Sequence, residues 1–192
     1  MRTAIIDRQT KETQIHVELN LDGGKTEINT GIGFFNHMLT AFSVHGGFGL
    51  VVNTVGDLDV DCHHTIEDTG IVLGKAFDKA LGDKSGIARF GSFYVPMDEA
   101  LGFCSLDISG RPFLVFDAEF SEEKIGMYDS CMTEEFMRAF AYNSGITLHL
   151  KSCYGKNSHH ITEALYKALA HALRLAVTAN GLDKPLSTKG VL

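Results

Sequence analysis

The chain has 192 residues, of which 44% are hydrophobic and 21% charged, a balance that is typical of folded globular proteins and excludes an intrinsically disordered chain. This length suits one domain, or two small halves that share a core. Seventeen Lys and Arg against 24 Asp and Glu give a formal net charge of −7. We therefore expect no nucleic-acid partner, because binding to nucleic acid requires a basic surface.

The apolar runs are all much shorter than the roughly 20 residues that a membrane-spanning helix needs, and the start of the chain lacks the apolar core of a signal peptide. The four cysteines, Cys62, Cys104, Cys131 and Cys153, are far apart and form no C-x-x-C motif. These features predict reduced thiols in a cytoplasmic protein with no membrane partner.

The first half of the chain begins with alternating apolar and polar side chains, the pattern of a half-buried strand. Its predicted elements are a strand over 14–21, a turn at 22–24 into a second strand over 25–29, a helix over 34–44, a strand over 48–55, and a long helix from the residues around 63 to Gly82. A glycine is a suitable stop for that last helix.

The second half repeats this order. Its predicted elements are a strand over 104–108, a turn at 109–112 into a strand over 113–116, a helix over 132–143, a strand over 146–151, and a long helix from about 159 to Asn180-Gly181. The tail from Asp183 to Leu192 follows. A further strand is expected at the start of each half.

Two motifs half the chain length apart support an internal duplication: His63-His64-Thr65-Ile66-Glu67 and His159-His160-Ile161-Thr162-Glu163. Each half then has the order strand-strand-strand-helix-strand-helix. We predict an α+β fold with two mixed sheets and the helices packed between them. The predicted halves are residues 1–91 and residues 92–192, and the second half carries the C-terminal tail.

The spacing inside each motif suits metal binding. Side chains four residues apart share a face of a helix, so His63 and Glu67 point the same way and His64 turns aside. The second copy has the same geometry. A reciprocal arrangement would give one ion His63, Glu67 and His160, and a second ion His159, Glu163 and His64. The two copies need not come from one subunit.

His37 in the first helix and His149 on the late strand can complete these sets, although the repeat position that matches His37 falls near Glu135. Imidazoles with a carboxylate suit Mn, Fe, Co, Ni or Zn rather than Ca or Mg, and the sequence does not name the ion. One such motif alone could be polar surface at the start of a helix, whereas two matching copies favour metal. His16 and His171 are expected to be structural or solvated.

Basic residues near glycines could hold a phosphate group. Arg89 follows Ser85-Gly86-Ile87-Ala88, Arg111 follows a turn glycine, and Lys167 shares a helical face with Glu163. Each of these residues, and Lys189 in the tail, could equally be a solvated surface charge. An arginine next to a glycine is however a usual way to hold phosphate, and metal ions can make one cleft of an acidic protein positive.

The chain also resembles a known family. The matching residues are Arg8-x-Thr10-Lys11-Glu12-Thr13, Gly33-Phe34-Phe35-Asn36-His37-Met38-Leu39, Asp57-Leu58-x-Val60-Asp61-x-His63-His64-Thr65-x-Glu67-Asp68, Pro96-Met97-Asp98-Glu99-Ala100, Asp107-x-Ser109-Gly110-Arg111-Pro112, Gly155-x-Asn157-x-His159-His160-x-x-Glu163 and Ser187-Thr188-Lys189-Gly190. They span nearly the whole chain and resemble imidazoleglycerol-phosphate dehydratase. Thr188 departs from the usual Ser-Ser-Lys tail but keeps a hydroxyl.

The resemblance implies a duplicated fold like the second domain of ribosomal protein S5, and two Mn²⁺ ions per active site, with other divalent transition metals possible. It implies a homo-oligomer of 24 subunits whose sites are shared between subunits. One ion would take His37, His64, His159 and Glu163, and the other His63, Glu67, His149 and His160. The substrate would contact Glu12, His45, Arg89, Arg111, Lys167, Ser187, Thr188 and Lys189.

The implied reaction belongs to amino-acid biosynthesis. The family dehydrates imidazole-glycerol phosphate to imidazole-acetol phosphate in histidine biosynthesis. We expect the metals to stabilise an imidazolate, which expels the neighbouring hydroxyl, and Glu12 to move the carbon-bound proton. Two alternatives remain at this point. A two-metal phosphate-ester hydrolase would normally be richer in Asp, and a binding module would be either a nucleic-acid domain or a metal store.

Overall fold

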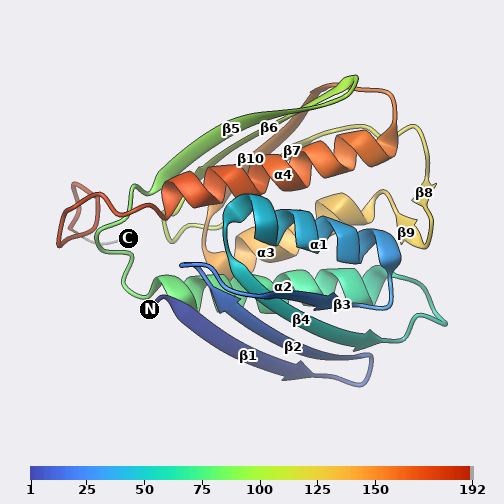
Figure 1. Ribbon diagram of the computed structural model, residues 1–192, viewed down its shortest axis with the longest axis horizontal. Helices are drawn as coiled ribbons and strands as arrows, with labels where there is room; N and C mark the ends of the chain where they lie inside the picture. The colour runs from blue at the N-terminus through green and yellow to red at the C-terminus, as the bar shows by residue number, and fades with distance from the viewer. Residues whose placement is uncertain (191–192) are drawn as a thin grey trace.

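The computed structural model describes residues 1–190, and the last two residues of the predicted tail, Val191 and Leu192, lie outside the described part. Two four-stranded sheets form the outer layers of the molecule, and four helices lie between them (Figure 1). The predicted α+β class and the layer order are confirmed.

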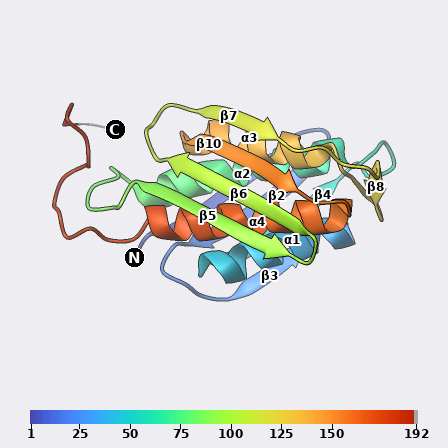
Figure 2. The same ribbon diagram turned by 90° about the horizontal axis from the view of Figure 1, so that it is seen from above.

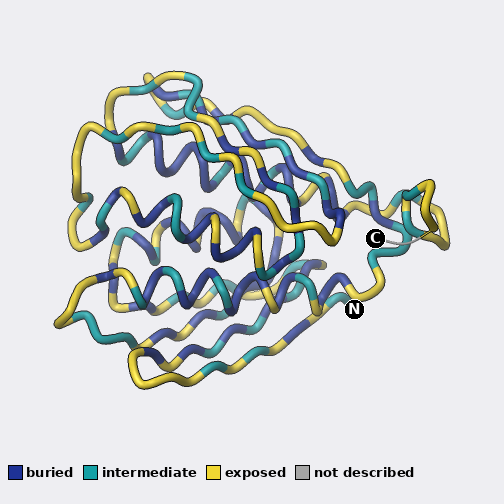
Figure 3. The backbone as a smooth tube through the Cα atoms, turned by 180° about the vertical axis from the view of Figure 1, so that it is seen from behind, coloured by how far each residue is buried: buried dark blue, intermediate teal, exposed yellow. Residues whose placement is uncertain are grey.

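The first half forms one sheet and two helices. The strands are β1 Thr3–Gln9, β2 Thr13–Asn20, β3 Thr26–Asn29 and β4 Gly49–Gly56, and the helices are α1 Gly33–Gly46 and α2 His63–Leu81. The strand order is β1-β2-β4-β3. Every second residue along β2 is buried and those between are partly or fully exposed, which is the pattern that predicted this strand. Figure 3 colours the backbone by this burial, with buried residues in dark blue.

The second half forms a sheet with the equivalent order, β5-β6-β10-β7. Its elements are β5 Phe90–Met97, β6 Ala100–Asp107, β7 Phe113–Asp117, α3 Met132–Ser144, β10 Thr147–Tyr154 and α4 Ser158–Ala176. A small unpredicted hairpin, β8 Lys124–Ile125 and β9 Tyr128–Asp129, precedes α3. The predicted division between residues 91 and 92 falls inside β5, and it stays a prediction.

The predicted turns at 22–24 and 109–112 connect strands that are not neighbours in the sheet. β4 lies between β2 and β3 and pairs with β3 in parallel, and β10 lies in the same way between β6 and β7. Parallel neighbours need a crossover, which α1 and α3 provide. The turns predicted at 22–24 and 109–112 each connect two strands, as expected, but turn residues do not determine which strand becomes the neighbour in the sheet.

The helices pack in pairs across the centre. α1 and α2 cover the first sheet, α3 and α4 cover the second, and the pairs meet as α1 on α4 and α2 on α3 (Figures 1 and 2). Buried aromatic rings fill the centre, with Phe136 stacked on Tyr166 at 5.1 Å between centroids. Gly74 lets α3 approach α2 closely, since a Cβ there would lie 2.7 Å from the carbonyl oxygen of Phe140.

The last helix ends earlier than predicted. α2 ends at Leu81, directly before Gly82, as expected, whereas α4 ends at Ala176, before the predicted stop at Asn180-Gly181. The chain beyond Ala176 pairs instead with the segment before β5, through Ala88 N–H to Thr178 O at 2.8 Å. No helix within residues 1–190 is both long and apolar enough to cross a bilayer.

Candidate active site

The first turns of α1, α2 and α4 lie at one end of the molecule, on the right in Figure 1. Local hydrogen bonds fix the starts of the two motif helices. The Asn157 side chain accepts hydrogen bonds from the backbone N–H groups of His159 and His160, and Asp61 accepts one from His63. These side-chain hydrogen bonds therefore fix the backbone at the start of each helix, from which the imidazoles of the motif project.

Three of the predicted ligands meet in one cluster: His37 from α1, and His159 and Glu163 from α4. One donor atom of each lies within 4.8 Å of the others. Glu163 Oε2 is 3.3 Å from His37 Nε2 and 3.2 Å from His159 Nε2. The Glu163 side chain is only 7% exposed, whereas about half of His37 faces solvent. Two imidazole nitrogens and a carboxylate oxygen around one point are a donor set that fits a divalent transition metal.

Lys167 holds the other oxygen of this carboxylate, with its Nζ 2.7 Å from Glu163 Oε1. Burial of Glu163 alone would raise the pKa of its carboxyl group, but the hydrogen bond and charge of Lys167, together with His37, lower it. The carboxylate is thus ionised, as a metal ligand must be. Lys167, predicted to bind the substrate, lies directly beside the cluster.

The first motif presents a similar pair on α2. His63 Nε2 lies 3.3 Å from Glu67 Oε2, as the helical spacing predicts. His64 points away, and its Nδ1 is 3.0 Å from a carboxylate oxygen of Asp57. The predicted catalytic residue Glu12 lies at the turn between β1 and β2, with Oε2 4.0 Å from His64 Nε2, and it lines a depression of about 270 Å³ together with Asp57.

His160 in the second motif has the matching arrangement. Its Nδ1 lies 2.7 Å from Glu99 Oε2 in the β5–β6 turn, and Glu99 Oε1 accepts the backbone N–H groups of Lys156 and Asn157. The N–H of Asn157 and the His160 ring lower the pKa of Glu99 to about 2. The hydrogen bond to Glu99 raises the pKa of His160, and the bond to Asp57 raises that of His64.

The carboxylates of Asp57 and Glu99 determine which ring nitrogen of His64 and His160 could bind a metal ion. A carboxylate that accepts from Nδ1 keeps the proton there, so the lone pair of a neutral ring sits on Nε2. Metal-binding histidines are usually held in this way. His64 and His160 occupy equivalent repeat positions, and both have this arrangement.

The eight predicted ligands do not converge within one chain. His37 joins His159 and Glu163, but His64 is held apart from them on the β4–α2 side by Asp57. His149 is exposed on β10, on the opposite face from Leu148 and Leu150, which are buried on the α4 side. In residues 1–190 the predicted ligands therefore form separate groups, each with open sides.

Two of the predicted phosphate-binding residues, Arg89 and Arg111, lie at the other end of α4, away from Lys167. Arg89 forms a two-pronged pair with Asp107, at 2.6 and 3.0 Å, and donates from NH1 to the Leu186 carbonyl at 2.6 Å. Arg111 approaches the same carboxylate at 3.7 Å. Leu186 directly precedes the tail residues Ser187, Thr188 and Lys189, so this part of the tail starts beside Arg89. His159 and Ala176 are separated by about 25 Å of helix at 1.5 Å per residue.

His45 lies between these two ends. Its Nδ1 is 3.1 Å from His171 Nε2, and the His171 ring stacks on Phe93 at 4.4 Å. Burial lowers the pKa of both imidazoles. His171, expected to be structural or solvated, is therefore part of a histidine pair on the α1–α4 face that also carries Lys167.

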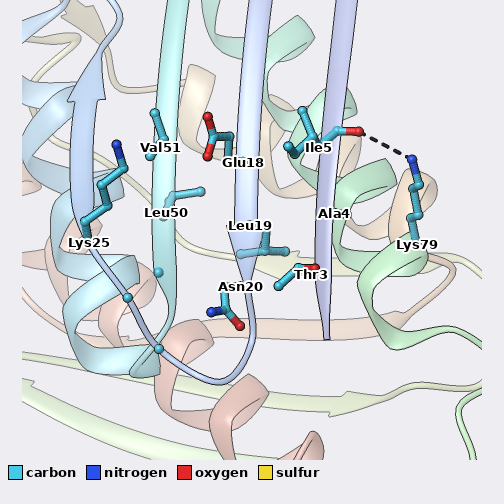
Figure 4. A pocket seen from close by; sticks show the side chains of 13 residues that line it. Thr3, Ala4, Ile5, Glu18, Leu19, Asn20, Lys25, Leu50, Val51 and Lys79 are labelled. Carbon is cyan, nitrogen blue, oxygen red and sulfur yellow. Dashed lines mark hydrogen bonds between the residues drawn. The ribbon is translucent and has the colours of Figure 1, made fainter. Parts of the chain in front are cut away.

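A second depression, of about 480 Å³, lies on the outer side of the first sheet beside Gly23 and Gly24 (Figure 4). It contains none of the predicted site residues. Lys79 donates to the Ile5 carbonyl at its edge. This hollow is separate from the histidine clusters.

Sequence reasoning did not assign a role to Asp57, Glu99 or Asp107. All three were within the motifs that carried the family resemblance, but no periodicity links them to their partners. Each lies in or next to a loop, and contact with the histidine or arginine is made only by the fold.

Comparisons with known proteins agree with this geometry. The family model for imidazoleglycerol-phosphate dehydratase matches residues 30–173, most of the chain. The chain belongs to this family. The dehydratase of Clostridium acetobutylicum is 57% identical over 191 residues, covering 98% of this chain and 97% of its own. That of Thermoanaerobacter pseudethanolicus is 57% identical over 194 residues, with both chains fully covered.

Two crystal structures of imidazoleglycerol-phosphate dehydratases have the same fold. The enzyme from Staphylococcus aureus has a TM-score of 0.84 at 42% identity, covering 92% of this chain and 100% of its own. The enzyme from Pyrococcus furiosus, solved in complex with (S)-C348, has a TM-score of 0.86 at 39% identity, covering 97% and 100%. Family membership makes this chain an enzyme, a hydro-lyase of histidine biosynthesis, as the sequence analysis expected.

Proposed function

We propose that this chain dehydrates imidazole-glycerol phosphate to imidazole-acetol phosphate with two divalent transition-metal ions per active site, Mn²⁺ being the first candidate. The observation that carries the metal proposal is the cluster of His37, His159 and Glu163, whose buried carboxylate has one oxygen directed at two imidazoles. The hydro-lyase family of the chain supports the reaction.

The carboxylate-held histidines supply the remaining donors. His64 and His160 would each bind through Nε2, because Asp57 and Glu99 hold Nδ1. His63 with Glu67 and the exposed His149 complete the second set. When bound, the ions supply Lewis acidity that stabilises the anionic form of an imidazole ring.

The proton chemistry falls to the chain's own residues. The carbon-bound proton beside the imidazole ring is not acidic, so its removal needs a positioned base. Glu12 is exposed at a turn, with its carboxylate 4.0 Å from His64 Nε2, and it lines the depression that Asp57 also lines. We assign Glu12 to this proton transfer.

The active site is shared between subunits in this proposal. Arg89 lies about 25 Å along α4 from His159, too far for one small phosphorylated imidazole to touch both. His149 and His64 likewise lie outside the His37 cluster, His149 exposed on β10 and His64 paired with Asp57. A closed homo-oligomer, for which we propose 24 subunits, would bring these groups together.

A subunit-mixing experiment tests the shared site. His159→Ala and His63→Ala variants should each be inactive, and unfolding and reassembling them together should restore part of the activity. Mixed assemblies that stay inactive, although both variants assemble, would contradict sharing. The assay should follow ketone formation and phosphate release in parallel, because phosphate release without ketone would indicate a hydrolase instead.

We also propose that the enzyme works in the cytoplasm, which its four unpaired cysteines support. The absence of nucleic-acid and membrane partners stays a prediction.

A further inference from the structure

Arg89 is held more firmly than a surface arginine. Its backbone has a φ of 72°, a left-handed conformation that residues other than glycine seldom adopt, and its N–H donates to the Ala176 carbonyl at the end of α4. Its side chain is 12% exposed, and the guanidinium lies 4.8 Å above the Phe90 ring. Such strained positions occur where the surrounding structure fixes a functional group.

Asp107 at the end of β6 is the centre of this arrangement. Its two carboxylate oxygens accept from Arg89 Nε and NH2 at 2.6 and 3.0 Å, and Arg111 NH2 lies 3.7 Å from the second oxygen. The hydrogen bond to Asp107 raises the pKa of Arg89. The Asp107 side chain is 19% exposed, whereas that of Arg111 is 65% exposed.

The remaining hydrogen-bond donors can be counted. A guanidinium has five N–H donors in a rigid plane. Asp107 takes two from Arg89, and the Leu186 carbonyl takes a third, at 2.6 Å. The other two make no hydrogen bond within residues 1–190, and their direction is fixed because the two-pronged pair prevents the plane from turning.

We propose that Asp107 is the positioning residue of the phosphate-binding end of the substrate site. It does not touch the substrate. It orients Arg89, keeps Arg111 close despite the repulsion between two guanidinium groups, and through Arg89 and Leu186 sets the start of the tail that carries Ser187 and Lys189. This inference rests on the proposed function, in which Arg89 and Arg111 bind the substrate phosphate.

The direction of the change in phosphate affinity distinguishes a positioning role of Asp107 from a purely electrostatic one. Removing a negative charge beside a phosphate site strengthens anion binding if charge alone matters. Removing the group that orients two arginines weakens it. Asp107→Asn keeps the shape of the side chain while it abolishes the charge, so the two explanations predict opposite changes.

The test uses the full chain loaded with Mn²⁺, and inorganic phosphate as a competitive inhibitor. For Asp107→Asn we expect the substrate KM and the phosphate inhibition constant each to rise about tenfold, as for the loss of one charge-assisted hydrogen bond, with kcat within about twofold. Asp107→Glu should fall between this variant and wild type. Asp117→Asn is the matched control, because Asp117 pairs with Lys151 at 2.6 Å on the same sheet.

An inhibition constant that is unchanged or lower in Asp107→Asn would overturn the proposal. If Asp107→Asn does not fold, Asp107→Glu decides alone, and a wild-type inhibition constant there overturns it. Arg111→Ala separates the two levels. If it raises the inhibition constant while the Asp107 variants do not, only the positioning role fails. If it too has no effect, the phosphate assignment of the proposed function fails, and the positioning role with it.

Discussion

Glu99→Gln should disable one metal ligand without removing it. Gln has nearly the same shape as Glu. In the wild-type chain Glu99 Oε1 accepts hydrogen bonds from the backbone N–H groups of Lys156 and Asn157, and the amide oxygen of Gln can still accept them. The NH2 group then faces His160 Nδ1, which must become an acceptor. The ring proton moves to Nε2, and His160 loses the lone pair with which it would bind metal.

In Glu99→Gln, the side chain at position 99 no longer orients the metal ligand His160. Such changes lower metal affinity about 10- to 100-fold. Only the ion predicted to bind His63, Glu67, His149 and His160 should be affected. Titration of the metal-free protein with Mn²⁺ should therefore change from two tight sites per chain to one tight and one weakened site, with activity recovering at high Mn²⁺.

Glu122→Gln is a close control. Glu122 also accepts a backbone N–H at the start of α4, from Ser158 at 3.0 Å, and hydrogen bonds from Ser158 and Ser121 lower its pKa to about 2. Within residues 1–190, Glu122 makes no hydrogen bond or ion pair with the His160 ring, whose partners are Glu99 and Asp98. Equal metal affinity in Glu99→Gln and wild type, or an equal loss in both variants, would refute the tautomer argument.

Four further predictions concern other parts of the structure. His63→Ala should lower both metal content, measured by elemental analysis, and dehydratase activity, and unchanged metal would remove it from the ligand set. Glu12→Gln should lower kcat by about 10²- to 10⁴-fold at unchanged metal content, and near-normal turnover would exclude it as the base. The pKa values of His64 and His160 are raised above 6.5, so their carboxylate contacts stabilise the metal-free fold below pH 6.5, and this stabilisation is lost as the pH rises through the raised values. A metal ion that binds Nε2 of His64 or His160 must displace the proton of a protonated ring, so Mn²⁺ affinity should fall from about pH 8 to pH 6. Calorimetry in two buffers measures the released protons, and a pH-independent affinity would contradict this. Gly91→Ala should lower the free energy of unfolding by about 1–3 kcal/mol in denaturant titrations, since its Cβ would overlap the carbonyl oxygen of Ala172 in α4; an unchanged midpoint would show that α4 can shift.

The duplicated architecture was predictable because it rests on local patterns. Alternation along β2 and helical spacing after each motif are written in consecutive residues. The parallel pairing of β3 with β4, and of β7 with β10, was not predictable in this way. Their position depends on which strand the crossover helix returns to, and no residue in the turn at 22–24 carries that information.

The site was predictable to the extent that one helix contains it. The pairs His63 with Glu67 and His159 with Glu163 follow from helical spacing. Helical spacing could not predict that His37 contacts Glu163, because this contact depends on the packing of α1 on α4. Nor could it indicate Asp107, whose partners Arg89 and Leu186 come from distant segments that meet only after folding.

The most direct test of the metal-dependent account is the metal content of the purified full chain, with ketone formation measured before chelation, after it, and after Mn²⁺ is added back. We predict two transition-metal ions per chain, loss of ketone formation on chelation, and recovery with Mn²⁺. A metal-free chain that still forms ketone at the full rate would contradict it.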